Sequence, residues 1–347
     1  MDENLDFNSL QASLLPDDPK WFEDLRVQAL HSYERVPWLG GDLQTVAHRL
    51  IHRDRLIPGV KTLMQFPLRD QSGDIMTGTL HDPGEGGPLV ILLHGLSGSE
   101  DSVYVRGTAH HLAQQGTRVL RLNHRGAGSS LKSCSIPYQC AGTTEIIEIL
   151  DSLSDELTKS GIFLCGFSMG GAILLNILSE IGRDPRICGA MTVSAPLDLT
   201  AASIQLNRYR NVIYQKVLLA TLMRFERTLR NSCELVDDEP LRNPCSLFEY
   251  DELFTAPRHG FTSAVDYYQK TSPLPRLKNI RVPVVMLHAE NDPWITSDPY
   301  RLTAKNCHTN IRILLTEYGG HVGFHFRQRS NPFYFDVLNQ MLSANKK

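Results

Sequence analysis

Residues 161–171 read Gly-Ile-Phe-Leu-Cys-Gly-Phe-Ser-Met-Gly-Gly, and this stretch decides the fold that we expect. The apolar run 162–165 is typical of a short buried strand, and the apolar residues 172–178 are typical of a helix. Between them lies the pattern G-x-S-x-G, with Ser168 at its centre. A strand, a tight turn and a helix around this pattern expose the serine on a strained turn. We therefore predict that Ser168 is a nucleophile; the alternative is an unreactive serine in a glycine-rich turn.

Apolar runs elsewhere in the chain alternate between strand-like and helix-like patterns. The continuous run at 88–93 is typical of a strand that is buried on both faces of a sheet. The other predicted strands lie at about 61–68, 75–81, 117–123, 188–193, 282–288 and 311–315, and predicted helices lie at about 103–115, 142–159 and 333–342. This alternation predicts an α/β fold: a mostly parallel sheet with helices on both faces and ligands at the carboxyl ends of the strands.

The alternation stops between residues 197 and 278, where a long helical pattern covers 212–229. We predict that this stretch is a helical cap over the carboxyl edge of the sheet. The expected domains are an N-terminal arm (1–55), a core in two parts (56–196 and 279–347) and the cap (197–278). Apolar side chains of the long helix could line a pocket for an acyl chain or form the interior of the cap. Its basic side could contact anionic lipid.

A serine is a weak nucleophile at neutral pH and needs a base within hydrogen-bond reach. His321 is our candidate base, because it lies in a glycine-flanked loop after the last predicted strand. Asp292, in the loop after the preceding strand, is our candidate for the carboxylate that orients the imidazole. Glu290 is a weaker candidate for the acid. The weaker candidates for the base are His288, His308 and His325.

A second loop of interest follows the strand at 88–93 and begins His94-Gly95-Leu96. A His-Gly loop after a central strand is typical of the loop that supplies one backbone N–H to an oxyanion hole. We predict that the N–H groups of Leu96 and Met169 point at the oxygen that becomes negative during acyl transfer. The alternative is a plain turn between a strand and a helix.

Two further patterns favour no cofactor or metal. The glycine-rich residues 124–130 lack the Gly-Lys-Ser/Thr ending of a phosphate loop, so we interpret them as a structural turn. His48 and His52 share a helical spacing, but Arg49 stands where a zinc protease has glutamate. We expect neither a cofactor nor a metal ion.

The composition is ordinary for a globular protein, with 41% hydrophobic and 21% charged residues. A net charge of −3 gives no reason to expect a nucleic-acid partner. The chain starts with acidic residues and contains no apolar run of about 18 residues, so we expect neither a signal peptide nor a transmembrane helix. Seven cysteines without metal-type spacing favour a reducing, cytoplasmic compartment.

The chain resembles the YheT-like family of α/β-hydrolases, which includes bacterial hydrolases, yeast medium-chain ester synthases/esterases and animal phospholipid- and acylglycerol-processing proteins. The resemblance runs from about residue 37 to 324. It is carried by Leu43-Gln44-Thr45, His94-Gly95-Leu96, Asn123-His124-Arg125-Gly126, Gly166-Phe167-Ser168-Met169-Gly170-Gly171, Ser194-Ala195-Pro196, Tyr267-Tyr268, His288-Ala289-Glu290-Asn291-Asp292-Pro293 and Gly319-Gly320-His321-Val322-Gly323-Phe324.

This resemblance implies an α/β-hydrolase fold with an eight-stranded type of sheet and a cap inserted after the sixth strand. It maps the family's triad onto Ser168, Asp292 and His321. The implied function is hydrolysis of short- to medium-chain acyl esters, which would be small-molecule or lipid-like substrates. Alternatives are transfer of the acyl group to an alcohol and a non-catalytic binding module. The animal members carry an N-terminal membrane anchor that this chain lacks, so we expect a protein closer to the bacterial type.

Overall fold

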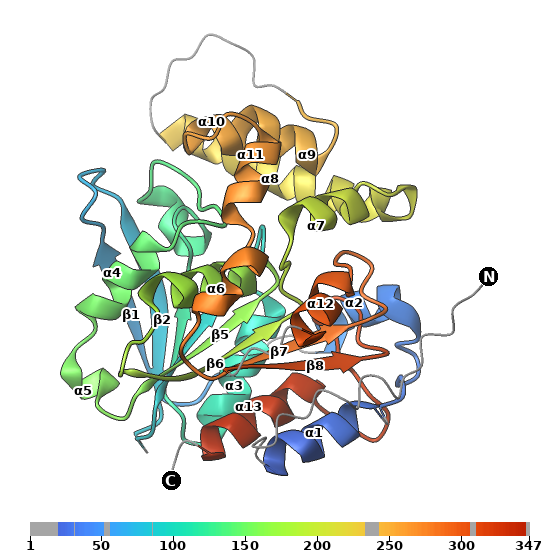
Figure 1. Ribbon diagram of the computed structural model, residues 1–347. Coiled ribbons are helices and arrows are strands. Elements are labelled where there is room, and N and C mark those ends of the chain that lie inside the picture. The colour runs from blue at the N-terminus through green and yellow to red at the C-terminus, as the bar shows by residue number, and fades with distance from the viewer. Residues whose placement is uncertain are drawn as a thin grey trace.

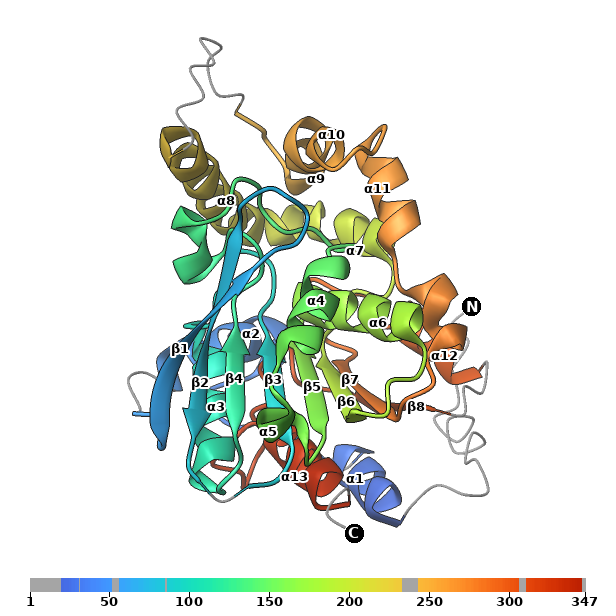
Figure 2. The same ribbon diagram turned by 90° about the vertical axis from the view of Figure 1, so that its left-hand side faces the viewer.

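The strands of the protein form one eight-stranded sheet with helices on both faces (Figures 1 and 2). The computed structural model describes residues 20–30, 32–51, 56–84, 86–232, 243–305 and 310–344. The strands are β1 (Val60–Pro67), β2 (Ile75–Asp82), β3 (Leu89–Leu93), β4 (Val119–Leu122), β5 (Ile162–Phe167), β6 (Ile187–Val193), β7 (Val284–Ala289) and β8 (Ile311–Thr316). Only the pairs β1–β2 and β2–β4 are antiparallel. The predicted mostly parallel α/β sheet is confirmed.

The helices cover the sheet in two layers. They are α1 (Lys20–Leu30), α2 (Gly40–Ile51), α3 (Val103–Gln114), η2 (Gly128–Lys132), α4 (Thr144–Ser152), α5 (Asp155–Thr158), α6 (Met169–Ile181), α7 (Leu199–Leu206), η3 (Tyr209–Asn211), α8 (Val212–Ser232), α9 (Leu247–Tyr250), η4 (Asp251–Thr255), α10 (Ala256–Arg258), α11 (Ala264–Thr271), η5 (Leu274–Asn279), α12 (Asp298–Lys305) and α13 (Phe333–Ala344). In β3, Leu89, Ile91 and Leu93 face the layer with α4 and α6, whereas Val90 and Leu92 face α1, α3 and α13. Every β3 side chain is therefore buried, as its continuous apolar run predicts.

The order of the strands creates the crevice in which the site lies. The spatial order is β1-β2-β4-β3-β5-β6-β7-β8, so β3 lies between β4 and β5. The chain leaves β3 toward β4 on one side and leaves β5 toward β6 on the other. Connections that diverge from two neighbouring parallel strands leave an opening at their carboxyl ends. The loop after β3 and the turn after β5 border this opening.

The segment between β6 and β7 contains α7 to α11 and lies above the carboxyl edge of the sheet (Figures 1 and 2). It has its own apolar cluster, which includes Leu218, Leu222 and Met223 of α8. Leu218 and Leu222 also line the cavity over the sheet. The apolar side of α8 thus contributes both to this cluster and to the wall of the cavity. No helix in the described part of the chain is long and apolar enough to cross a bilayer.

The structure describes part of the expected arm and corrects one expected helix. Within the expected arm, α1 packs against the sheet through Phe22 and Leu25, which are almost fully buried; residues 1–19 and 52–55 lie outside the described residues. The helix expected at 142–159 is interrupted, because Leu153 adopts an extended backbone and is buried in the core.

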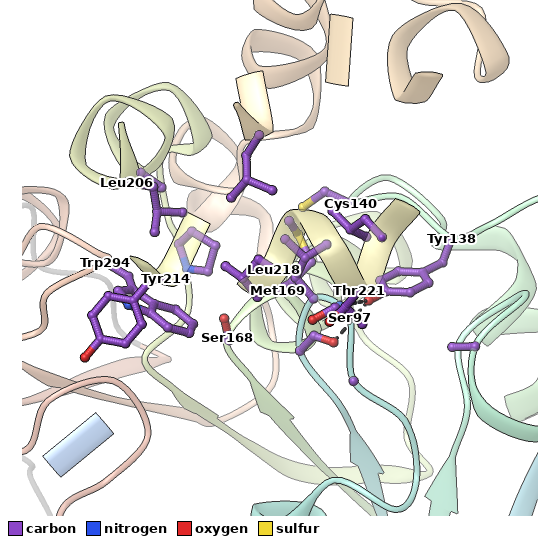
Figure 3. A pocket seen from close by; sticks show the side chains of 18 of the residues that line it. Ser97, Tyr138, Cys140, Ser168, Met169, Leu206, Tyr214, Leu218, Thr221 and Trp294 are labelled. Carbon is purple, nitrogen blue, oxygen red and sulfur yellow. Dashed lines mark hydrogen bonds between the residues drawn. The ribbon is translucent and has the colours of Figure 1, made fainter. Parts of the chain in front are cut away.

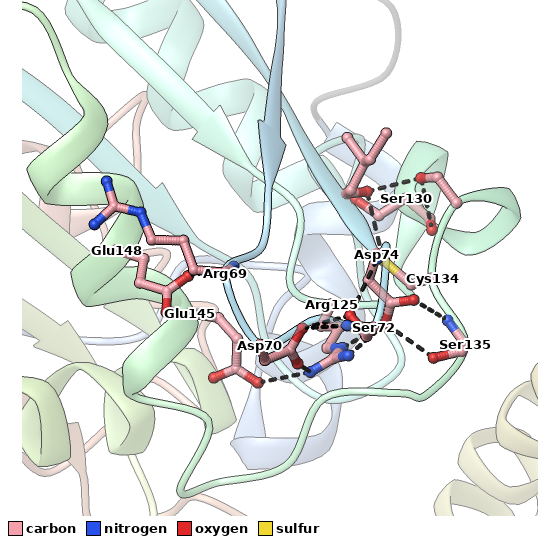
Figure 4. Close-up of polar contacts among 12 residues, drawn as sticks. Arg69, Asp70, Ser72, Asp74, Arg125, Ser130, Cys134, Ser135, Glu145 and Glu148 are labelled. Carbon is pink, nitrogen blue, oxygen red and sulfur yellow. Dashed lines mark hydrogen bonds and ion pairs between the residues drawn. The ribbon is translucent and has the colours of Figure 1, made fainter.

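A buried arginine ties the early strands to the loops at the carboxyl edge (Figure 4). The guanidinium of Arg125, in the loop after β4, donates to Asp74 at 2.6 Å and to Asp70 at 2.7 Å. Its Nη1 also lies 3.5 Å from Glu145 of α4. The side chains of Arg125 and Asp74 are only 6% and 4% exposed, so water screens this pair weakly. The contacts fix the turn before β2 and the loop after β4 relative to α4.

We expect Asp74→Ala to lower the free energy of unfolding by about 3 kcal/mol, because it leaves a buried guanidinium short of counter-charge. The matched control is Asp151→Ala, which removes a half-exposed partner of Arg186 and should cost less than about 1 kcal/mol. Urea unfolding of both variants measures the difference. Equal losses would contradict the importance that we assign to the buried pair.

Candidate active site

The turn between β5 and α6 holds Ser168 in a strained backbone conformation. Its φ is 51° and its ψ is −124°, which non-glycine residues seldom adopt. A Cβ at Gly166 would collide with the backbone of Gly170, and a Cβ at Gly170 would collide with the carbonyl of His94. Both glycines are therefore needed for the strand, the helix and the loop after β3 to approach this closely.

The structure brings Ser168, His321 and Asp292 together from three separate loops. Nε2 of His321 lies 2.9 Å from Oγ of Ser168, and Nδ1 lies 2.8 Å from Oδ2 of Asp292. A carboxylate can only accept, so Nδ1 carries the proton of the neutral imidazole. Nε2 is then an acceptor for the serine hydroxyl. The arrangement can draw a proton from Ser168 toward His321.

The carboxylate of Asp292 is buried but well supplied with donors. Burial alone would raise its pKa, but the His321 ring and the backbone N–H of Trp294 outweigh burial and lower the pKa below its usual value. Oδ1 accepts from the N–H groups of Trp294 at 2.8 Å and Ile295 at 3.1 Å. Asp292 is therefore ionised and fixed in orientation beside the imidazole.

The loop that carries His321 is held by α2, from the other end of the chain. The backbone N–H of His321 donates to the hydroxyl of Thr45 at 2.9 Å. The amide of Gln44 accepts from the N–H of His325 at 2.9 Å and donates to its carbonyl at 2.8 Å. Gly320 lies so close to the backbone of Gly41 that a Cβ would collide with it. Our sequence reasoning assigned these α2 residues no role, although the Leu-Gln-Thr motif was a visible signal.

One of the weaker candidates lies beside the site: Nδ1 of His288 is 3.9 Å from Oδ2 of Asp292, too far for a hydrogen bond. Glu290 accepts from Arg301 at 2.6 Å and has no contact with His321. His288 stacks on Tyr300, and burial lowers its pKa to about 4.

The remaining histidine candidates do not join this arrangement. His325 is 1% exposed, and its ring has no hydrogen bond with Ser168. His308 and His52 lie outside the described residues, and the side chain of His48 is not described. Among the described residues, no group of three or more His, Cys, Asp or Glu side chains could hold a metal ion.

Two backbone N–H groups at the serine remain open to a ligand. Leu96 follows Gly95, where an added Cβ would lie only 2.9 Å from Cβ of Ser168. Met169 is the first residue of α6, where backbone N–H groups have no partner within the helix. The N–H groups of Leu96 and Met169 make no hydrogen bond with another described residue. Both residues line the cavity at Ser168, so the arrangement can accommodate an anionic oxygen there.

A cavity of about 840 Å³ opens above Ser168, between the sheet and the cap (Figure 3). Trp294 and Tyr214 lie on one side of the serine, and Tyr138 and Cys140 lie on the other. The ring of Trp294 also packs against His321, with ring centroids 4.3 Å apart. The cavity has the size and the apolar lining typical of a small-molecule site.

Comparisons with known proteins identify the family of the chain. The family model described as the alpha/beta hydrolase fold matches residues 88–327. The mouse phospholipase ABHD3 is 31% identical over 68% of this chain and 58% of its own length. The Escherichia coli protein YheT is 29% identical over 68% of this chain and 70% of its own length. This chain thus spans less than two thirds of the length of its mammalian relatives.

A solved structure supports the fold alone. An esterase of Pyrococcus furiosus superposes with a TM-score of 0.56 at 17% identity, covering 82% of this chain and 91% of that one. The chain belongs to the family with the alpha/beta hydrolase fold.

Proposed function

We propose that the chain is a serine hydrolase of carboxylic esters that acts through a covalent acyl-enzyme. The observation that carries the proposal is the continuous path of hydrogen bonds from Ser168 through His321 to the ionised Asp292. An activated serine beside open backbone N–H groups is suited to acyl transfer. The family membership supports the same class of reaction.

In the first half of the reaction, Oγ of Ser168 attacks the ester carbonyl carbon while its proton moves to Nε2 of His321. Asp292 stabilises the imidazolium that results. The carbonyl oxygen becomes negative and accepts hydrogen bonds from the N–H groups of Leu96 and Met169. The bond to the alcohol then breaks, and the departing alkoxide takes the proton from Nε2.

In the second half, a water molecule replaces the alcohol. His321 takes a proton from the water, and the hydroxide attacks the acyl carbon of the acyl-enzyme. The same N–H groups stabilise the second oxyanion. When this intermediate collapses, Oγ of Ser168 regains the proton and the carboxylic acid leaves. Each step uses only groups of the chain, the ester and water.

We propose short- to medium-chain acyl esters, small or lipid-like, as the substrates. A cavity of about 840 Å³ is large enough for an acyl chain and an alcohol moiety together. Leu218 and Leu222 of the cap form an apolar wall beside the serine. The mouse relative is named a phospholipase, which supports a lipid-like ester as the substrate class.

We also propose that the outer side of the cap contacts an anionic lipid surface weakly. From Leu199 to Thr228 the single acidic residue is Glu226, which is 3% exposed and paired with Arg258. Ile213 is 72% exposed and lines the cavity, and Tyr209 is 92% exposed. Exposed cations accompany these apolar side chains: Arg208, Arg210, Lys216, Arg224 and Arg227. Of these cations, Arg210 pairs with Asp42 at 2.9 Å. Apolar side chains among an excess of exposed cations suit a bilayer with anionic headgroups better than an acidic protein.

For location, we propose the cytoplasm. The five cysteines within the described residues, Cys134, Cys140, Cys165, Cys188 and Cys245, are all free thiols. Free thiols persist in a reducing compartment.

We expect Ser168→Ala to lower kcat for p-nitrophenyl esters at least about 10³-fold, because the nucleophile is lost. Wild-type turnover should peak between the butanoate and the decanoate. Ser179→Ala is the matched control, since it removes a buried hydroxyl from the same helix and should retain activity. Labelling by a fluorophosphonate probe gives a second measurement. Turnover or labelling that survives Ser168→Ala would rule out this nucleophile.

We expect Asp292→Asn to lower kcat about 10³- to 10⁴-fold, because an amide neither stabilises the imidazolium nor favours the required tautomer. Glu290→Gln removes the other nearby carboxylate and should leave kcat within about twofold, since Glu290 contacts Arg301 instead. Steady-state kinetics of both variants test the assignment. The reverse pattern would make Glu290 the acid.

We expect the protein to sediment with phosphatidylcholine vesicles only when they contain phosphatidylserine. Reversing two cap charges in Lys216→Glu/Arg224→Glu should weaken this binding about tenfold or more, because each basic residue contributes about 1 kcal/mol at such a surface. Lys159→Glu/Lys278→Glu makes the same charge change outside α7 and α8 and serves as the control. If both double variants weaken vesicle binding equally, net charge alone explains the effect and the cap is not the membrane-binding surface.

A further inference from the structure

The peptide that joins Gly95 to Leu96 contains the Leu96 N–H, a candidate donor to the oxyanion, and the Gly95 carbonyl, which accepts several hydrogen bonds. In a trans peptide the C=O and the N–H point in opposite directions. The Gly95 carbonyl accepts from the Tyr138 hydroxyl at 3.1 Å, from His94 Nδ1 at 2.8 Å and from the Gly98 N–H at 3.1 Å. Three donors on the carbonyl hold the N–H of Leu96 on the opposite side of the peptide. Leu96 lines the cavity beside Ser168, and its N–H has no partner among the described residues.

The other N–H groups of the same loop already have partners. Gly95 donates to the hydroxyl of Tyr104 at 2.9 Å, and Ser97 donates to the hydroxyl of Tyr138 at 3.0 Å (Figure 3). Gly98 donates to Gly95. Of the four consecutive N–H groups from Gly95 to Gly98, that of Leu96 alone lacks a partner among the described residues. Tyr138 takes part on both sides of it, as donor to Gly95 and as acceptor from Ser97.

The histidine contact on this carbonyl has a fixed proton. Nε2 of His94 accepts from the backbone N–H of His124 at 3.2 Å, so that nitrogen carries no hydrogen. The proton of the neutral ring therefore lies on Nδ1 and is donated to Gly95. Complete burial and the neighbouring His124 ring hold the pKa of His94 well below its usual value. His94 thus remains a neutral donor.

Tyr138 is itself held in place by contacts of its backbone and of its ring. Its backbone N–H donates to the carbonyl of Arg125 at 2.9 Å, and its ring stacks on His124 with centroids 4.7 Å apart. Arg125 is locked by Asp74 and Asp70, as Figure 4 shows. Burial raises the pKa of the Tyr138 hydroxyl, so it keeps the proton that it donates. The aromatic ring therefore presents its hydroxyl to the loop from a rigid support.

We propose that Tyr138 is a positioning residue that aims the Leu96 N–H at the oxyanion and so determines the rate of acyl transfer. The inference rests on the proposed ester hydrolysis and adds a residue outside the triad to it. A donor on the carbonyl of a peptide also polarises the N–H of that peptide. Both effects act on the negative oxygen that forms in the transition state, and much less on the neutral ester.

The test is Tyr138→Phe, which removes the hydroxyl and keeps the ring that stacks on His124. We expect kcat for p-nitrophenyl butanoate to fall about tenfold or more, with KM within about twofold of wild type. The affinity for a trifluoromethyl ketone, whose adduct carries an oxyanion, should fall by the same factor as kcat/KM. A role confined to stability would not produce this match.

Tyr300→Phe is the matched control. Tyr300 is also buried, and its hydroxyl donates to the carbonyl of Ala195 at 2.6 Å, but it does not line the cavity. We expect a similar change in melting temperature for both variants and wild-type kcat for Tyr300→Phe. Titration of the active sites with a fluorophosphonate corrects kcat for any fraction that fails to fold.

The possible outcomes separate the two proposals. If the wild type hydrolyses esters and the kcat of Tyr138→Phe lies within twofold of the wild-type kcat, the role of Tyr138 is overturned and the proposed function stands. A loss through KM alone also overturns it, because it would make Tyr138 a wall of the substrate pocket. A wild type that neither hydrolyses esters nor reacts with the fluorophosphonate overturns the proposed function and this inference with it.

Discussion

The backbone of Ser168 is the constraint on which the rest of the site depends. A non-glycine residue with φ of 51° and ψ of −124° costs about 1–3 kcal/mol, which neighbouring structure must offset. The offset comes from β5, whose six residues are all buried, and from the buried interior of α6. Because these elements are rigid on both sides of the turn, the hydroxyl and the first N–H of α6 keep a fixed relation to each other. The loop after β3 must then fit against that fixed turn, and glycines at 95 and 170 make the fit possible.

The histidine side of the site follows a different logic, since it is assembled from loops rather than from one turn. The loop at 319–324 has positive φ at Gly319, Gly320, Val322 and Phe324, so it has little preference of its own for this shape. Contacts with α2 replace that missing local preference. Thr45 and Gln44 hold it by hydrogen bonds, and Asn291 accepts from the N–H of Gly320 at 2.9 Å. Helix α2 is thus as much a part of the site as the core.

These two halves differ in how far the sequence predicts them. The turn at Ser168 depends on residues that are close in the sequence: a buried strand, three glycines and a helix follow one another directly. The sequence pattern and its context are therefore enough to predict this turn. The strands were predictable for the same reason, because both faces of β3 and β5 are buried and their runs are continuously apolar. The contacts between α2 and the loop of His321 were not predictable, because Thr45 and His321 are 276 residues apart and no periodicity in the sequence indicates such a contact. The short helices α9 and α10 escaped prediction because four and three residues are too few to show a helical period.

Four histidines meet at the carboxyl edge, and their surroundings divide their roles. Burial lowers the pKa of His124 and of His288 to about 4, and that of His94 further below its usual value. These three rings stay neutral and pack against aromatic side chains without placing charge beside an apolar cavity, and the rings of His94 and His124 also bond to backbone groups. His321 differs from them because an ionised carboxylate lies on one ring nitrogen and a hydroxyl on the other. A proton that leaves Ser168 therefore has one favourable destination among these four rings, and the charge that it creates lies against Asp292. The same low-dielectric surroundings that keep three rings neutral strengthen this one ion pair, so the burial of the edge and the proposed reactivity of Ser168 have a common physical origin.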